Sequence, residues 1–160
     1  MSHPSLGLAP RDLTRGFPDA ATRIRANTSR LAARALEIHA ARDATLLKRK
    51  DEVALRELLR DAEVFIERLA LSVAGDDPYW LGGFSEHTAV IYRRNRIRMD
   101  DAIGLLEGIR AASRAVIAGD AVRAADAALD AGVHAFREHR KLAGDARPRN
   151  RIIQFLYKGA

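Results

Sequence analysis

Arginine is concentrated at one point of this sequence, in the segment HTAVIYRRNRIRMDDAIGLLEGIR at residues 87–110. Within six positions this segment holds Arg93, Arg94, Arg96 and Arg98. A cluster of guanidinium groups is a candidate site for an anion or an acidic partner. A simpler interpretation places the arginines in the last two turns of a helix, just before an Asp100 cap, where they complement the helix dipole. We favour the simpler interpretation for most of them and keep the interaction site as the alternative.

The C-terminal segment RPRNRIIQFLYKGA, residues 147–160, is the second candidate interaction surface. Its basic residues bracket a group of apolar side chains that would be costly to leave in water. We therefore expect the segment to dock onto its own bundle, across a dimer or onto a separate protein. The candidate interaction residues are Arg149, Arg151, Ile152, Ile153, Phe155, Leu156 and Tyr157.

Histidine makes only a weak case for a cofactor. A di-iron bundle needs Glu-x-x-His pairs, whereas this chain has adjacent Glu-His pairs at 86–87 and 138–139, whose side chains diverge by about 100° on a helix. Haem needs only one axial histidine, and His87 is the better candidate because it shares a helix face with Phe84 and Ile91. We expect no metal and no cofactor, and keep a haem-binding gas sensor as an alternative.

Motifs for covalent catalysis and phosphate binding are missing from the sequence. Ser72, Ser85 and Ser113 lack a Gly-x-Ser-x-Gly elbow, and the 11 glycines are scattered rather than grouped in a phosphate loop. Because the chain has no cysteine, disulfides, thiolate nucleophiles and zinc–thiolate sites are excluded. We therefore expect a protein that is not an enzyme.

The net charge of +6 permits contact with nucleic acid but does not demand it. The helix expected after the arginine cluster carries mostly small and apolar residues, with Arg110 and Arg114 its only basic ones. A DNA-reading helix needs several long polar side chains, so nucleic acid is disfavoured as a partner. No segment approaches the roughly 20 apolar residues of a membrane span, and we expect a cytoplasmic protein without one.

Hydrophobic spacing predicts an all-α fold, a single-domain bundle of about five main helices, because apolar residues recur every three to four positions and no stretch alternates. A flexible N-terminal arm is expected at 1–17, the helical bundle at 18–146 and the basic amphipathic segment at 147–160. The first helix is expected to be long, to start near Pro18 and to bend near Asp43.

Polar and glycine residues predict where the other four helices begin and end. Asp51 is expected to cap the second helix, which ends at Gly75, and a Gly-Gly pair at 82–83 is expected to separate a turn from a helix that begins near Ser85. Aspartates at 100 and 120 are expected to cap the last two helices. The predicted core consists of Leu55, Leu58, Leu59, Ala62, Phe65, Ile66, Leu69, Ile103, Leu106, Ile109, Val116, Val122, Leu129, Val133 and Phe136.

With this order of helices, the chain resembles a known family. The passage from ALRELLRDAEVFIERLA to FSEHTAVIYRRNRIRMDDAIGLLEGIRAASRAVI is similar to the N-terminal sensor domains of bacterial stressosome co-antagonist proteins, the RsbRD-type, non-haem globin-like domains. The shared pattern is a helix that ends in an arginine-containing stretch, a turn with aspartate, and a helix of the type DDAIGLLEGIRAA. The resemblance covers roughly residues 20–143.

This resemblance implies a globin-like helical packing without haem, a homodimer, and a signalling role in the cytoplasm without catalytic residues. An output domain follows the sensor domain in that family, so we expect this chain to act through a signalling protein partner or as a one-domain relative. The expected function is a non-catalytic sensory or protein-interaction module in bacterial signalling. The alternatives are the haem-binding gas sensor and a basic adaptor for nucleic acid or an anionic surface.

Overall fold

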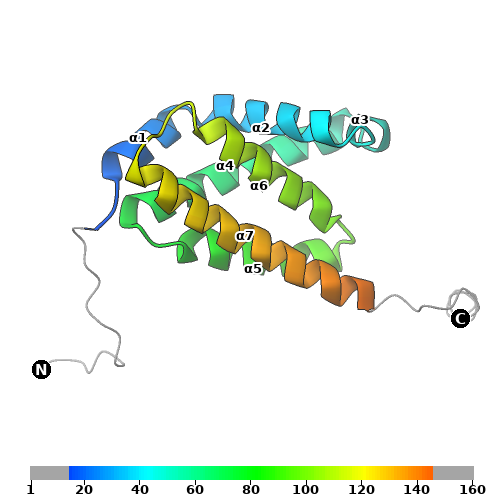
Figure 1. Ribbon diagram of the computed structural model, residues 1–160. Coiled ribbons are helices and arrows are strands. Elements are labelled where there is room, and N and C mark those ends of the chain that lie inside the picture. Colours follow the sequence, from blue (N-terminus) through cyan, green and yellow to red (C-terminus); the bar gives the residue numbers. More distant parts are fainter. Residues whose placement is uncertain (1–14, 146–160) are drawn as a thin grey trace, which may run out of the picture.

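The computed structural model describes residues 15–145, and all regular structure within that range is helical (Figure 1). The all-α prediction is therefore confirmed for this part of the chain. The elements are α1 (Pro18–Ala26), α2 (Thr28–Arg42), α3 (Leu46–Arg49), α4 (Glu52–Gly75), α5 (Tyr79–Arg94), α6 (Met99–Ser113) and α7 (Asp120–Asp145). The predicted C-terminal segment and most of the predicted N-terminal arm lie outside the described residues.

The predicted first helix is divided into α1, α2 and α3. Asn27 ends α1, because its side-chain amide donates to the carbonyl of Arg23 at 2.8 Å and its backbone leaves the helical range at φ −118°. A polar side chain that bonds to the nearby backbone in this way competes with the helical ladder. The second break, at 43–45, coincides with the predicted bend. The prediction of one continuous helix is wrong at Asn27.

Helix α4 begins and ends where the sequence predicts. The carboxylate of Asp51 accepts a hydrogen bond from the backbone N–H of Ala54 at 2.8 Å, which satisfies one of the unpaired groups of the first turn. The helix runs to Gly75, and Asp76 turns the chain away in the left-handed conformation, at φ 47°.

Two predicted helix starts are wrong. No turn separates Tyr79 from the rest of α5, because the helix continues through Gly82, where a Cβ would lie 2.9 Å from the Cβ of Ala131. This glycine allows α5 and α7 to approach each other and does not bend the chain. Helix α6 begins at Met99, and the Asp100 side chain forms an ion pair with Arg140 on α7 at 2.6 Å instead of capping the helix.

The core lies where α4, α6 and α7 meet, with α2 packed on α6 and α5 packed on α7. At its centre the ring of Phe65 contacts those of Phe84 and Phe136 edge-on, with centroids 5.8 and 5.9 Å apart. Most predicted core residues are buried. Five of them pack against the core while partly exposed: Leu55, Leu59, Ile103, Val116 and Val122.

Phe17 also packs against this core, and its N–H donates to the carbonyl of Val73 at 3.0 Å. Packing against the core therefore includes a residue that precedes the predicted boundary at Pro18. Among residues 15–145, no helix combines the length and the apolarity that crossing a lipid bilayer requires.

Helices α2 and α6 approach each other closely at two glycines of α6. A Cβ at Gly108 would lie 2.4 Å from the carbonyl oxygen of Ala35, a backbone atom that cannot rotate away. A Cβ at Gly104 would lie 2.1 Å from Nδ1 of His39. The missing side chains therefore set the distance between α2 and α6.

We predict that Gly108→Ala lowers the free energy of unfolding by roughly 1–3 kcal/mol, although alanine favours helices, because the added methyl group pushes α6 away from α2. Gly75→Ala is the matched control, since a Cβ there meets nothing within 4 Å. That control should raise stability by up to about 1 kcal/mol. Urea denaturation measures both values, and a stabilising Gly108→Ala would contradict the close approach.

Candidate functional site

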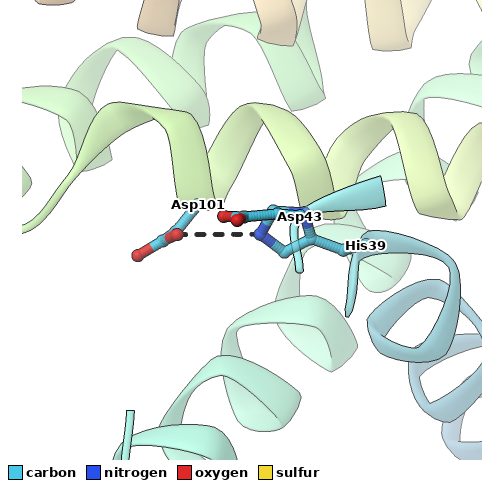
Figure 2. A group of neighbouring side chains, drawn as sticks. All are labelled: His39, Asp43 and Asp101. Atoms are coloured by element: carbon cyan, nitrogen blue, oxygen red, sulfur yellow. Dashed lines mark ion pairs between the residues drawn. The ribbon is translucent and has the colours of Figure 1, made fainter. Parts of the chain in front are cut away.

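A buried carboxylate, that of Asp101, lies at the centre of a polar cluster at one end of the bundle. Asp101 belongs to the first turn of α6 and is fully buried. Figure 2 shows how His39, from the last turn of α2, and Asp43, just after α2, lie beside it. Arg49 of α3 and Lys50 complete the cluster.

Two cations hold the Asp101 carboxylate. The two terminal nitrogens of Arg49 donate to its two oxygens, at 2.7 and 3.2 Å. The ammonium group of Lys50 lies 3.0 Å from Oδ2. A paired guanidinium and a second cation supply the hydrogen bonds that a carboxylate loses when it leaves water.

Arg49 also holds Asp43. Its Nη2 donates to Oδ2 of Asp43 at 2.6 Å. The other oxygen of Asp43 accepts hydrogen bonds from the N–H and the hydroxyl of Thr45, at 3.0 and 2.6 Å. One guanidinium therefore connects the end of α2, the short helix α3 and the start of α6. We term Asp43, Arg49, Lys50 and Asp101 the ionic clasp.

Electrostatics keep the ionic clasp charged. Burial by itself would raise the pKa of Asp101, but contacts from His39, Arg49 and Lys50 outweigh it and hold the pKa of that carboxyl well below its usual value. The hydrogen bonds from Thr45 and then from Arg49 lower the pKa of Asp43. The hydrogen bond to Asp101 raises the pKa of Arg49. At neutral pH the two carboxylates and the Arg49 guanidinium are therefore charged and pair with one another.

His39, Asp43 and Asp101 include the residue types of a metal site, and one ligand atom from each lies within 4.8 Å of the others. The position between the carboxylates is already filled, because Nη2 of Arg49 lies 2.6 and 2.7 Å from them. A divalent cation would have to displace this guanidinium while Lys50 stays on the same carboxylate. The arrangement favours an internal clasp over a metal centre.

His39 itself has an incompletely satisfied ring. Its Nε2 lies 3.6 Å from Oδ1 of Asp101, which is longer than a normal hydrogen bond, and this buried atom has no closer partner among the described residues. The ring packs against Gly104, where a Cβ would overlap it. His39 therefore fills the space between α2 and α6 and leaves no room there for a planar cofactor.

A partly buried polar pair lies at the end of α5, next to the arginine cluster. The hydroxyl of Tyr92, in the last turns of α5, donates a hydrogen bond to the carboxylate of Asp61 on α4. Burial raises the pKa of Asp61, and burial together with this hydrogen bond raises the pKa of Tyr92. The pair fixes the end of α5 against α4.

Between these two anchors, the chain leaves α5 through a hydrogen-bonded turn. The N–H of Ile97 donates to the carbonyl of Tyr92 at 2.8 Å, and that of Arg96 donates to Arg93 at 3.3 Å, which is the pairing of a Schellman motif. The left-handed position of this motif normally holds glycine, but here Arg96 occupies it, at φ 56°. A side chain in this conformation costs roughly 1–2 kcal/mol. The chain thus carries a guanidinium where glycine would be more stable.

The structure corrects the predicted placement of the arginine cluster. Only Arg93 and Arg94 lie in the last turn of α5, while Arg96 lies in the linker and Arg98 precedes α6 as its N-cap. All four side chains are exposed. Arg98 lies 3.7 Å from Asp100, and the other three have no carboxylate within 4.0 Å among residues 15–145. Helix-end electrostatics therefore explains at most Arg93 and Arg94.

The other predicted site residues do not gather with this cluster. His87 is exposed on α5, whereas an axial haem ligand normally lies in an enclosed pocket. The candidates Arg149, Arg151, Ile152, Ile153, Phe155, Leu156 and Tyr157 lie outside the described residues.

Sequence reasoning missed the cross-helix pairs. The sequence places Glu and His next to each other at 86–87 and 138–139, whereas Glu86 of α5 meets His139 of α7 at 2.7 Å. The ionic clasp was also missed, because Arg49 and Asp101 are 52 residues apart. Two features of the sequence could have indicated the clasp: an aspartate in the first turn of an apolar helix, and the basic run at 48–50.

No family model, curated protein or solved structure matches this chain. The resemblance to stressosome sensor domains therefore remains a prediction, and the function has to be argued from the geometry.

We predict that Asp101→Asn destabilises the fold by roughly 3 kcal/mol, the lower end of the range for a broken buried ion pair, because Arg49 and Lys50 can still reach solvent. Asp100→Asn is the neighbouring control. Its pair with Arg140 is about half exposed, so the loss should stay below about 1 kcal/mol. Urea denaturation at neutral pH measures both losses. Equal losses of unfolding free energy would show that the clasp stabilises the fold no more than an exposed ion pair does.

The pH dependence of stability checks the same interaction. The folded-state pKa values of Asp43 and Asp101 lie below the ordinary value of 3.8, so their stabilising effect is present above that value and lost as the pH falls through the folded values. The free energy of unfolding should therefore fall more steeply below about pH 4 in the natural chain than in Asp101→Asn. The raised pKa of Asp61 acts in the opposite sense in both proteins and cancels from the comparison.

We also predict that Arg96→Gly raises the free energy of unfolding by about 1 kcal/mol, because glycine adopts the left-handed conformation without strain. Arg94→Gly is the control. Arg94 lies within α5, where glycine costs about 1 kcal/mol in helix propensity. The free energy of unfolding of Arg94→Gly should therefore fall. A destabilised Arg96→Gly would mean that the arginine makes a compensating contact.

Proposed function

We propose that this chain is a non-catalytic sensory or interaction module in signalling, which acts by binding a protein partner. The observation that carries the proposal is Arg96, an exposed guanidinium kept in a strained position where it meets no carboxylate of residues 15–145. A residue that lowers stability and makes no compensating internal contact points to a contact with another molecule.

The non-catalytic part of the proposal rests on the ionic clasp. Catalytic acids and bases need pKa values near the working pH and access to a substrate. Asp101 is instead fully buried, and its pKa is driven away from neutrality by groups that neutralise it. Among residues 15–145, one cluster brings a histidine and two carboxylates within reach of one another, namely His39, Asp43 and Asp101. Both carboxylates belong to the ionic clasp, which supports a structural role for this cluster.

The haem alternative has less support from the residues. His87 is exposed, and the buried His39 is packed against Gly104 without space for a porphyrin. The proposal also includes the globin-like packing, the cytoplasmic setting and the homodimer that the resemblance implies. Sedimentation analysis tests the dimer, and absorbance in the Soret region after haem is added tests the alternative.

Site-specific photo-crosslinking tests the proposed function. Ile97→benzoylphenylalanine places the crosslinker beside the arginines, on a side chain that is 37% exposed. Val64→benzoylphenylalanine, on α4 with 43% exposure, is the matched control. In cells that make the full chain, we expect a discrete adduct with another polypeptide from position 97 and none of the same mass from position 64. No adduct, or the same adduct from both positions, would contradict the proposal.

A further inference from the structure

Several exposed side chains lie close together in sequence around the α5–α6 linker. Four arginines of this segment are exposed, and two isoleucines beside them are also uncovered, Ile91 at 41% and Ile97 at 37%. We term this the arginine surface, and it consists of Ile91, Arg93, Arg94, Arg96, Ile97 and Arg98. It combines charge with apolar area over a short stretch of backbone.

We propose that the arginine surface binds an acidic segment of another protein, in which carboxylates alternate with apolar side chains. This inference rests on the proposed function and names the class of partner. Guanidinium groups pair with carboxylates through two parallel hydrogen bonds, and Arg93, Arg94 and Arg96 have that capacity unused toward residues 15–145.

The charge of the surface argues against two occupants, the C-terminal segment and a second copy of the chain. The segment at 147–160 carries Arg147, Arg149, Arg151 and Lys158 and no acidic side chain, so it would repel the surface. A symmetric contact between two copies would place one arginine surface against another. An acidic segment of a different protein avoids both repulsions.

Side-chain chemistry favours a protein over a nucleic acid. Proteins that bind single strands stack bases on aromatic rings, whereas the uncovered apolar residues of this surface are both isoleucines. A carboxylate also flanks the surface, because Asp100 lies 3.7 Å from Arg98. Such a carboxylate would repel a phosphate backbone but leave room for a partner whose acidic groups are few and spaced.

The backbone under the surface is held in place before any partner arrives. Tyr92 is bonded to Asp61 on one side of the linker, and Asp101 is held by Arg49 on the other. The N–H of Asp101 also donates to the carbonyl of Arg98 at 3.2 Å. Binding therefore costs little conformational entropy in the linker. So small a surface supports only weak, transient binding.

Fluorescence anisotropy with a labelled synthetic peptide that alternates glutamate and leucine tests the inference on the full chain. We expect saturable binding that weakens as salt is raised from about 0.05 to 0.5 M. The same peptide with glutamine in place of glutamate should bind roughly tenfold more weakly or not at all. Oligothymidine of equal length serves as the nucleic-acid probe and should bind more weakly than the acidic peptide.

Matched variants locate the binding. Arg94→Ser and Arg96→Gly should each weaken peptide binding roughly two- to fivefold, the effect of one exposed ion pair. Arg30→Ser is the control, because Arg30 is an exposed arginine of α2 without a carboxylate within 4.0 Å among residues 15–145, and its loss changes the net charge equally. That control should bind as the natural chain does. Circular dichroism checks that each variant is folded.

Three results would overturn the inference: equal weakening in Arg30→Ser, equal binding of the glutamine peptide, or tighter binding of oligothymidine. If the acidic peptide is not bound but Ile97 still crosslinks to a polypeptide, the partner chemistry is wrong and the proposed function stands. If peptide binding and crosslinking are both absent, both proposals fail.

Discussion

The guanidinium of Arg49 is the contact on which this end of the bundle depends. A buried carboxylate is costly in a protein interior unless cations and hydrogen bonds replace its water, and Arg49 supplies two hydrogen bonds to Asp101. The same group holds Asp43, so the route from α2 to α4 is tied to α6. Helix α3 has only four residues, too few to be stable alone, and the buried side chain of Leu46 and this clasp hold it.

The position of the arginine surface follows from this constraint. Because Asp101 is in the first turn of α6, the clasp determines where that helix starts and therefore where the preceding linker lies. Tyr92 and Asp61 fix the other end of the linker against α4. Arg96 is thus held in a strained conformation by well-satisfied contacts on both sides. Stability generated inside the bundle offsets strain at its surface.

Some elements could be predicted because their signals are local. The apolar stripe of α4 and its Asp51 cap depend only on residues within a few turns, so both are as expected. Three other signals misled, two because tertiary contacts reversed them and one because a local side-chain bond ended the helix. Gly82 packs against α7 instead of bending the chain, Asp100 pairs with Arg140 instead of capping a helix, and Asn27 breaks a pattern that remains apolar on both sides.

The sequence by itself therefore determined the helical class, most of the core residues and the cluster of exposed arginines, because hydrophobic period and charge density are properties of neighbouring residues. Only the tertiary structure decided that His39, Asp43 and Asp101 meet, and that Arg49 fills the position between the carboxylates. Which charged groups become buried depends on how closely distant helices approach, here through Gly104 and its contact with His39. The free energy of such a pair depends on how much solvent is lost around it, because that loss penalises each charge and strengthens their attraction. No local pattern in the sequence records it.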